Sequence, residues 1–171
     1  MSLADALTLF RALAGIPIFI AIGYGDRSLA LAIFVAAALS DAVDGWLARR
    51  AGTTGGRGVV LDPLADKALV TLTLVALALA GLVPLALAAL VVVRELFVTL
   101  LRAQAHRRGA RVPATLPTKL KTACEMAALT LLIWGPSASS ADAGVVLLSA
   151  ALAIGLATLP LYLPHPRRRL T

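Results

Sequence analysis

The chain has 171 residues, of which 60% are apolar and 15% are charged, and its 16 lysines and arginines outweigh its 9 acids to give a net charge of +7. Soluble domains usually contain about 25% charged residues, so this composition argues against a soluble enzyme and against a disordered chain. The single cysteine, Cys124, excludes an intrachain disulfide and a cysteine-rich zinc site.

Six long apolar stretches follow one another along the chain, and the length favours a single domain over residues 1–171. A helix needs about 20 mostly apolar residues to cross a bilayer. The predicted spans are residues 7–24, 28–46, 61–81, 83–101, 121–134 and 143–163. The fifth is short, and residues 117–121 extend it as an amphipathic start. Because strands of alternating polarity are absent from the sequence, we expect an all-α integral membrane bundle of six transmembrane helices.

Basic residues gather in every second connection between the spans. Arginines are frequent between spans two and three, between spans four and five, and at the end of the chain. The other three connections contain a single basic residue, Arg27. The positive-inside rule therefore predicts a multi-pass protein of the cell (inner) membrane with both termini in the cytoplasm. Attraction to anionic membrane lipids accounts for these arginines as well. We expect no nucleic-acid binding, because the sequence has no reader motif.

Four aspartates lie where the second span ends and the third begins. Asp41 and Asp44 are three residues apart, and Asp62 and Asp66 are four apart, so each pair shares one face of a helix. If the two helices pack side by side, the four carboxylates converge and repel one another. Divalent cations that prefer oxygen ligands, such as Mg²⁺, Mn²⁺ or Ca²⁺, would remove that conflict. Buried salt bridges are the alternative interpretation of these acids.

Small residues accompany the first aspartate pair. Gly45 and Ala48 continue the helix face of Asp41 and Asp44, which leaves a shallow groove beside the carboxylates. A flat base or a diphosphate can lie against the backbone in such a groove. Close helix packing through small residues is the alternative.

The whole pattern resembles the complete signature of the CDP-alcohol phosphotransferases. It reads Asp41-x2-Asp44-Gly45-x2-Ala48-Arg49-x8-Gly58-x3-Asp62-x3-Asp66. The resemblance implies a membrane enzyme with six transmembrane helices, usually a homodimer, in which an alcohol displaces CMP from a CDP-linked substrate with the help of divalent metal ions. It also implies that two Mg²⁺ (or Mn²⁺) ions are held by Asp41, Asp44, Asp62 and Asp66. Asp66 would act in addition as the catalytic general base. The residues implied to border the CDP moiety are Gly45, Ala48, Arg49 and Gly58.

Other segments are similar to the family members that make phosphatidylglycerophosphate. They are residues 7–11 with Pro17, residues 61–67, Arg94–Glu95 with Arg102, and residues 117–122. This similarity implies transfer of a phosphatidyl group from CDP-diacylglycerol to sn-glycerol 3-phosphate. Thr118 departs from the pattern, because a glycine is expected there. Two alternatives stay open: the same chemistry with another alcohol, as in a CMP-forming cardiolipin synthase or an inositol-phosphate transferase, and a cation transporter.

A second set of residues is basic and suits an acceptor that carries its own phosphate. The predicted acceptor phosphate-binding residues are Arg94, Arg102, Lys119, Lys121 and Arg11. Arginine favours bidentate contacts with phosphate. Lys119 and Lys121 have an alternative interpretation, which is snorkelling to the membrane interface. Glu95 directly follows Arg94, so we expect it to face another way and to pair with another helix. Glu125 has no assigned role.

Overall fold

The computed structural model describes residues 3–51, 58–107, 115–135 and 137–162. Within these ranges, the description leaves out the side chains of residues 3–9, 12, 41–51, 58–66, 106–107 and 161–162. Every regular element in the described ranges is helical, which confirms the all-α prediction. The elements are α1 (Leu3–Gly23), α2 (Arg27–Ala51), α3 (Gly58–Leu79), α4 (Leu85–Arg107), α5 (Leu116–Trp134), α6 (Ala138–Ala157) and the 3-10 helix η1 (Leu159–Tyr162).

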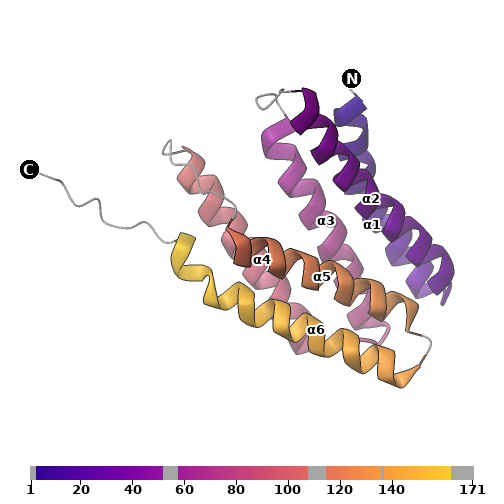
Figure 1. The fold of residues 1–171 in the computed structure, drawn as a ribbon. Coiled ribbons are helices and arrows are strands. Elements are labelled where there is room, and N and C mark those ends of the chain that lie inside the picture. The colour runs from indigo at the N-terminus through magenta and orange to yellow at the C-terminus, as the bar shows by residue number, and fades with distance from the viewer. Residues whose placement is uncertain (1–2, 52–57, 108–114, 136, 163–171) are drawn as a thin grey trace, which may run out of the picture.

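The helices form two packed groups, which meet where α5 contacts α2 and α3 (Figure 1). In the first group, α1 packs against both α2 and α3, and in the second α5 packs against α6. Helix α3 also contacts α4 and α5, while α4 contacts α6 and η1. The close approach of α1 to α3 depends on Gly15, because a Cβ there would lie 2.7 Å from Cδ1 of Leu72.

The six helices correspond to the six predicted spans but differ from them at their ends. Helix α2 continues to Ala51 and α3 begins at Gly58, so both are longer at the aspartate end than predicted. Helix α5 begins at Leu116, which confirms that residues 117–121 extend the fifth stretch. A left-handed Gly135 (φ 30°) ends this helix, and its N–H donates to the carbonyl oxygen of Leu131.

Helix α6 begins five residues before the predicted start at residue 143, because Ser137 caps it. The hydroxyl oxygen of Ser137 accepts the backbone N–H of Ser140 at 3.3 Å, and the hydroxyl oxygen of Ser140 accepts the N–H of Ser137 at 3.2 Å. This reciprocal capping box satisfies two backbone donors at the start of the helix. The helix ends at Ala157 rather than at residue 163, and η1 follows it.

One helix among the described residues, α6 (Ala138–Ala157), is long and apolar enough to cross a membrane by length and composition. Shorter apolar stretches occur at Leu13–Gly23, Arg27–Ser40 and Lys67–Leu79. The number of membrane crossings therefore stays a prediction.

The described surface is apolar where a soluble protein is usually polar. Large apolar side chains are exposed on α1, α2, α4 and α6, and on α4 they form a stripe of Leu90, Val93, Leu96, Phe97 and Leu100. Five ionisable residues are buried within an interior that is otherwise mostly apolar. They are Arg11, Arg94, Glu95, Lys121 and Glu125. Fully buried charged residues are rare in soluble proteins.

Candidate functional site

The four aspartates lie on the two helices that the sequence predicts to carry them. Asp41 and Asp44 belong to the C-terminal half of α2, and Asp62 and Asp66 to the first turns of α3. The C-terminal end of α2 and the N-terminal end of α3 lie at the same end of the bundle (Figure 1). Helix α1 contacts both of these helices and is therefore their common support.

The side chains of the aspartate pattern lie outside the described residues. This applies to Asp41, Asp44, Gly45, Ala48, Arg49, Gly58, Asp62 and Asp66. Their assignment to metal and CDP binding stays a prediction. Among the side chains that are described, no group of three His, Cys, Asp or Glu residues is placed to hold a metal ion.

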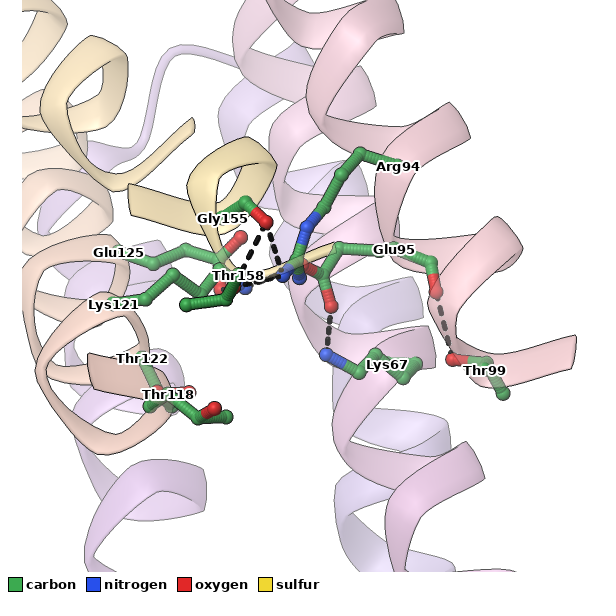
Figure 2. A network of polar contacts seen from close by, with 10 residues as sticks. All are labelled: Lys67, Arg94, Glu95, Thr99, Thr118, Lys121, Thr122, Glu125, Gly155 and Thr158. Atoms are coloured by element: carbon green, nitrogen blue, oxygen red, sulfur yellow. Dashed lines mark hydrogen bonds and ion pairs between the residues drawn. The ribbon is translucent and has the colours of Figure 1, made fainter. Parts of the chain in front are cut away.

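The described side chains do form a buried charge cluster between α3, α4 and α5 (Figure 2). We define the charge cluster as Lys67, Arg94, Glu95, Lys121 and Glu125. Glu95, Lys121 and Glu125 are each 2% exposed, and Arg94 is 7% exposed. Burial of charge at this level is costly unless the charges are paired, and here ion pairs connect all five members.

Glu95 is the centre of this cluster. One carboxylate oxygen, Oε2, accepts from the ammonium group of Lys67 on α3. The other, Oε1, accepts from Arg94 on the same helix and from Lys121 on α5. Lys121 also donates to Oε2 of Glu125, one turn further along α5, at 2.6 Å. A single carboxylate thus joins three helices.

Arg94 connects the cluster to the end of α6. Its Nη2 donates to the carbonyl oxygen of Gly155 at 3.0 Å and to the hydroxyl oxygen of Thr158 at 3.4 Å. The Thr158 hydroxyl in turn donates to the same carbonyl oxygen at 2.9 Å. The cluster therefore holds four helices together through charge-assisted hydrogen bonds.

The sequence places these charges inside because they share helix faces with apolar residues. On α5, Lys121 and Glu125 are four residues apart and continue into buried Ala128, Leu129 and Leu132. On α4, Glu95 follows buried Ala88 and Val91 at helical spacing. Burial of the apolar stripes brings the charges into the interior with them.

The predicted acceptor residues fall into separate places. Arg94 and Lys121 belong to the charge cluster, where acids bind both. Arg102 and Lys119 instead line a shallow cavity of about 440 Å³ between α4 and α5, which is widely open to the surface. The remaining lining residues of that cavity are Thr118, Thr122, Ala123 and Met126. Arg11 is buried on α1. Phosphate binding by these five residues stays a prediction.

Two expectations about the acids can be compared with the structure. The expectation that Glu95 pairs with other helices is confirmed by its ion pairs with Lys67 and Lys121. The expectation that Glu95 faces away from Arg94 is wrong, because the long arginine side chain turns back and its Nη1 contacts Oε1 of Glu95. Sequence reasoning assigned no role to Glu125 and did not predict its ion pair with Lys121, although their spacing of four on an apolar helix face was an available signal.

Comparison with known proteins relates the sequence of this chain to enzymes that synthesise membrane lipids. The family model described as CDP-alcohol phosphatidyltransferase matches residues 1–159. A Mycobacterium tuberculosis protein named as a probable phosphatidylglycerophosphate synthase is 38% identical over 92% of this chain and 78% of its own length. An Escherichia coli K12 protein named CDP-diacylglycerol--glycerol-3-phosphate 3-phosphatidyltransferase is 35% identical over 94% of this chain and 92% of its own. A Shigella sonnei protein with the same name matches equally well.

Proposed function

Because the chain belongs to the CDP-alcohol phosphatidyltransferase family, we propose that it transfers the phosphatidyl group of CDP-diacylglycerol to sn-glycerol 3-phosphate. The products are phosphatidylglycerophosphate and CMP. The observation that carries this proposal is the similarity, over almost the whole chain, to relatives named for that reaction. The aspartate pattern on α2 and α3 fits the same reaction class.

The proposed setting is the cell (inner) membrane, with six spans and with both termini and the active site on the cytoplasmic side. An apolar outer surface around a buried charge cluster supports this setting. The arginines in alternate connections support the orientation. The membrane lipids would then surround α1 to α6, and the lipid donor would reach the site from the inner leaflet. We also propose that the protein is a homodimer, as is usual in the family.

The carboxylates of the four aspartates on α2 and α3 suit divalent metal ions, on which the family generally depends. Asp41, Asp44, Asp62 and Asp66 provide only oxygen ligands, and all four positions fall within helices. Carboxylate oxygens favour Mg²⁺ or Mn²⁺ over zinc. Two such ions, when bound, would polarise the phosphorus and stabilise the phosphate of the leaving CMP.

The chain's own residues have separate tasks in the proposed reaction. Asp66 takes the proton of the acceptor hydroxyl as that oxygen attacks the phosphorus of the phosphatidyl group. A new P–O bond to glycerol 3-phosphate forms, and the P–O bond to CMP breaks. Gly45, Ala48 and Gly58 leave room for the CDP moiety, and Arg49 contacts it.

The acceptor phosphate is proposed to bind in the cavity between α4 and α5. Arg102 and Lys119 line this cavity and supply positive charge, and the side chains of Thr118 and Thr122 add hydroxyl groups. Arg94 and Lys121 are paired with acids in the charge cluster, and together with Arg11 they stay predicted phosphate-binding residues.

The test is an acceptor comparison with the purified full-length protein in mixed micelles containing CDP-diacylglycerol. CMP release is measured with glycerol 3-phosphate, inositol phosphate or phosphatidylglycerol as the alcohol. We expect glycerol 3-phosphate to give the highest kcat/KM. A higher value with phosphatidylglycerol or inositol phosphate would assign the alternative acceptor. Ion flux through sealed vesicles without CMP release would favour the transporter.

A further inference from the structure

We propose that Glu95 is a positioning residue of the transfer reaction, which it serves by fixing Lys67 of α3 and Lys121 of α5 to one point. The role rests on the proposed function, since it concerns the same site. Glu95 is not placed to contact substrate, because its carboxylate is paired with three cations in the interior. Its effect on the reaction must therefore pass through the residues that it holds.

Each of the two lysines held by Glu95 lies on a helix that carries part of the proposed site. Lys67 directly follows Asp66 on α3, so an anchor at Lys67 fixes the rotation and depth of the α3 backbone at the proposed base. Lys121 is two residues beyond Lys119, which lines the cavity proposed for the acceptor phosphate. One carboxylate thus sets the distance between the aspartate helix and the acceptor cavity. Displacements of about 1 Å in such geometry can cost about 10²-fold in rate.

Two substitutions that each remove one acid from the cluster can distinguish the positioning role from a general need for charge balance in the interior. The cluster contains three cations and two acids, and Glu95→Gln leaves three cations with Glu125 alone. Glu125→Gln leaves the same charge balance, with three cations and one acid. Only the first substitution releases Lys67, because Glu125 is paired with Lys121 alone. Glu125→Gln is therefore a control that makes the same substitution at an equally buried acid of the cluster without releasing Lys67.

A second substitution isolates the link to α3 without charge imbalance. Lys67→Met removes one cation and leaves Arg94 and Lys121 balanced by Glu95 and Glu125. Lys67 has the most exposed side chain of the cluster, at 23%, so this variant is expected to fold even if Glu95→Gln does not. Lys67→Arg keeps the positive charge and the ability to pair with Glu95. It is the conservative variant that should rescue function.

The experiment measures steady-state CMP release by the full-length protein in mixed micelles, with both substrates varied, for the wild type and these variants. We expect Glu95→Gln and Lys67→Met each to lower kcat by about tenfold or more, with the KM for CDP-diacylglycerol little changed. The double variant should be no slower than the slower single variant, because both changes break one link. Glu125→Gln should lower the melting temperature less than Glu95→Gln, because it breaks one ion pair instead of three, and its kcat should also fall far less. Lys67→Arg should restore most of the kcat.

Hydrogen exchange provides a readout that does not depend on activity. In Glu95→Gln and Lys67→Met, exchange in α3 should rise, and in Glu125→Gln it should match that of the wild type. Equal kcat losses in Glu95→Gln and Glu125→Gln, or multiplied losses in the double variant, would overturn the positioning role. Unchanged exchange in α3 would also overturn it. Absence of CMP release from the wild type with every acceptor would overturn the proposed function instead, and the exchange result would still decide whether Glu95 anchors α3.

Discussion

The guanidinium group of Arg94 donates to the carbonyl oxygen of Gly155 at 3.0 Å, across 61 positions of the sequence. This contact requires glycine at position 155, because a Cβ there would lie 2.8 Å from Nε and 3.1 Å from Cζ of Arg94. The guanidinium group cannot easily move away, since Glu95 and Thr158 hold it from other sides. Gly155 and Arg94 therefore fix the contact between α4 and α6.

Gly155→Ala is expected to destabilise the protein by about 1–3 kcal/mol, because the added methyl group displaces a paired and buried guanidinium group. Thermal unfolding in one detergent measures the effect. Gly23→Ala is the matched control, since a Cβ at this helical glycine meets nothing within 4 Å. An equal melting temperature for the two variants would show that the contact between Arg94 and Gly155 contributes nothing measurable.

Lys119→Ala is expected to raise the KM for glycerol 3-phosphate by about tenfold or more, because a charge-assisted hydrogen bond contributes about 1.5–3 kcal/mol. Lys119 is exposed at the cavity, so its loss should leave the melting temperature unchanged. Steady-state CMP release at several acceptor concentrations measures the KM. Arg27→Met is the control, because it removes the same charge at the first residue of α2, where Arg27 donates to the carbonyl oxygen of Gly135. Equal KM changes in both variants would rule out a direct contact by Lys119.

Asp66→Asn is expected to lower kcat by about 10²-fold or more while largely preserving CDP-lipid binding, because an amide cannot accept the hydroxyl proton. Turnover is followed by CMP release, and binding by calorimetry with CDP-diacylglycerol in micelles. Asp142→Asn, an exposed change on α6, should leave both values at wild-type levels. If binding falls as far as turnover in Asp66→Asn, the residue is a ligand or structural group and not the base.

Metal removal is expected to stop the reaction. A chelator should abolish CMP release, and added Mg²⁺ or Mn²⁺ should restore it, because the proposed ligands are carboxylates. The same ions should raise the melting temperature of the wild type, and this rise should disappear in Asp62→Asn. Full turnover in a chelator-treated, metal-free sample would contradict the assignment of the four aspartates.

The helical architecture could be predicted from the sequence, because long apolar runs separated by polar connections leave few other solutions. The ends of the helices are harder to predict from the sequence. Ser137 and Ser140 belong to a polar segment that suggests a loop, yet their reciprocal hydrogen bonds begin α6. The helix face shared by Asp41 and Asp44 follows from their spacing, and α2 does contain both positions.

The charge cluster could not be predicted in full, because its members come from three helices whose packing the sequence does not specify. Arg94 and Glu95 are neighbours that helix geometry directs to different sides. Their contact depends on the length and flexibility of the arginine side chain, and on the presence of Gly155 opposite. The pairing of Glu125 with Lys121 does not follow from either interpretation of Lys121, a phosphate ligand or a residue that snorkels to the interface.

If the helices enter a bilayer one after another, as the proposed six-span topology requires, the charge cluster also implies an order of assembly. Arg94 and Glu95 arrive with α4, when Lys67 on α3 is their available partner from another helix. Lys121 arrives only with α5, and the carbonyl group of Gly155 only with α6. Until then, a strongly polar pair faces hydrocarbon at a high free-energy cost, so α4 should remain beside α3 instead of dispersing among acyl chains. Nascent chains that stop before α5 should accordingly be removed by quality-control proteases.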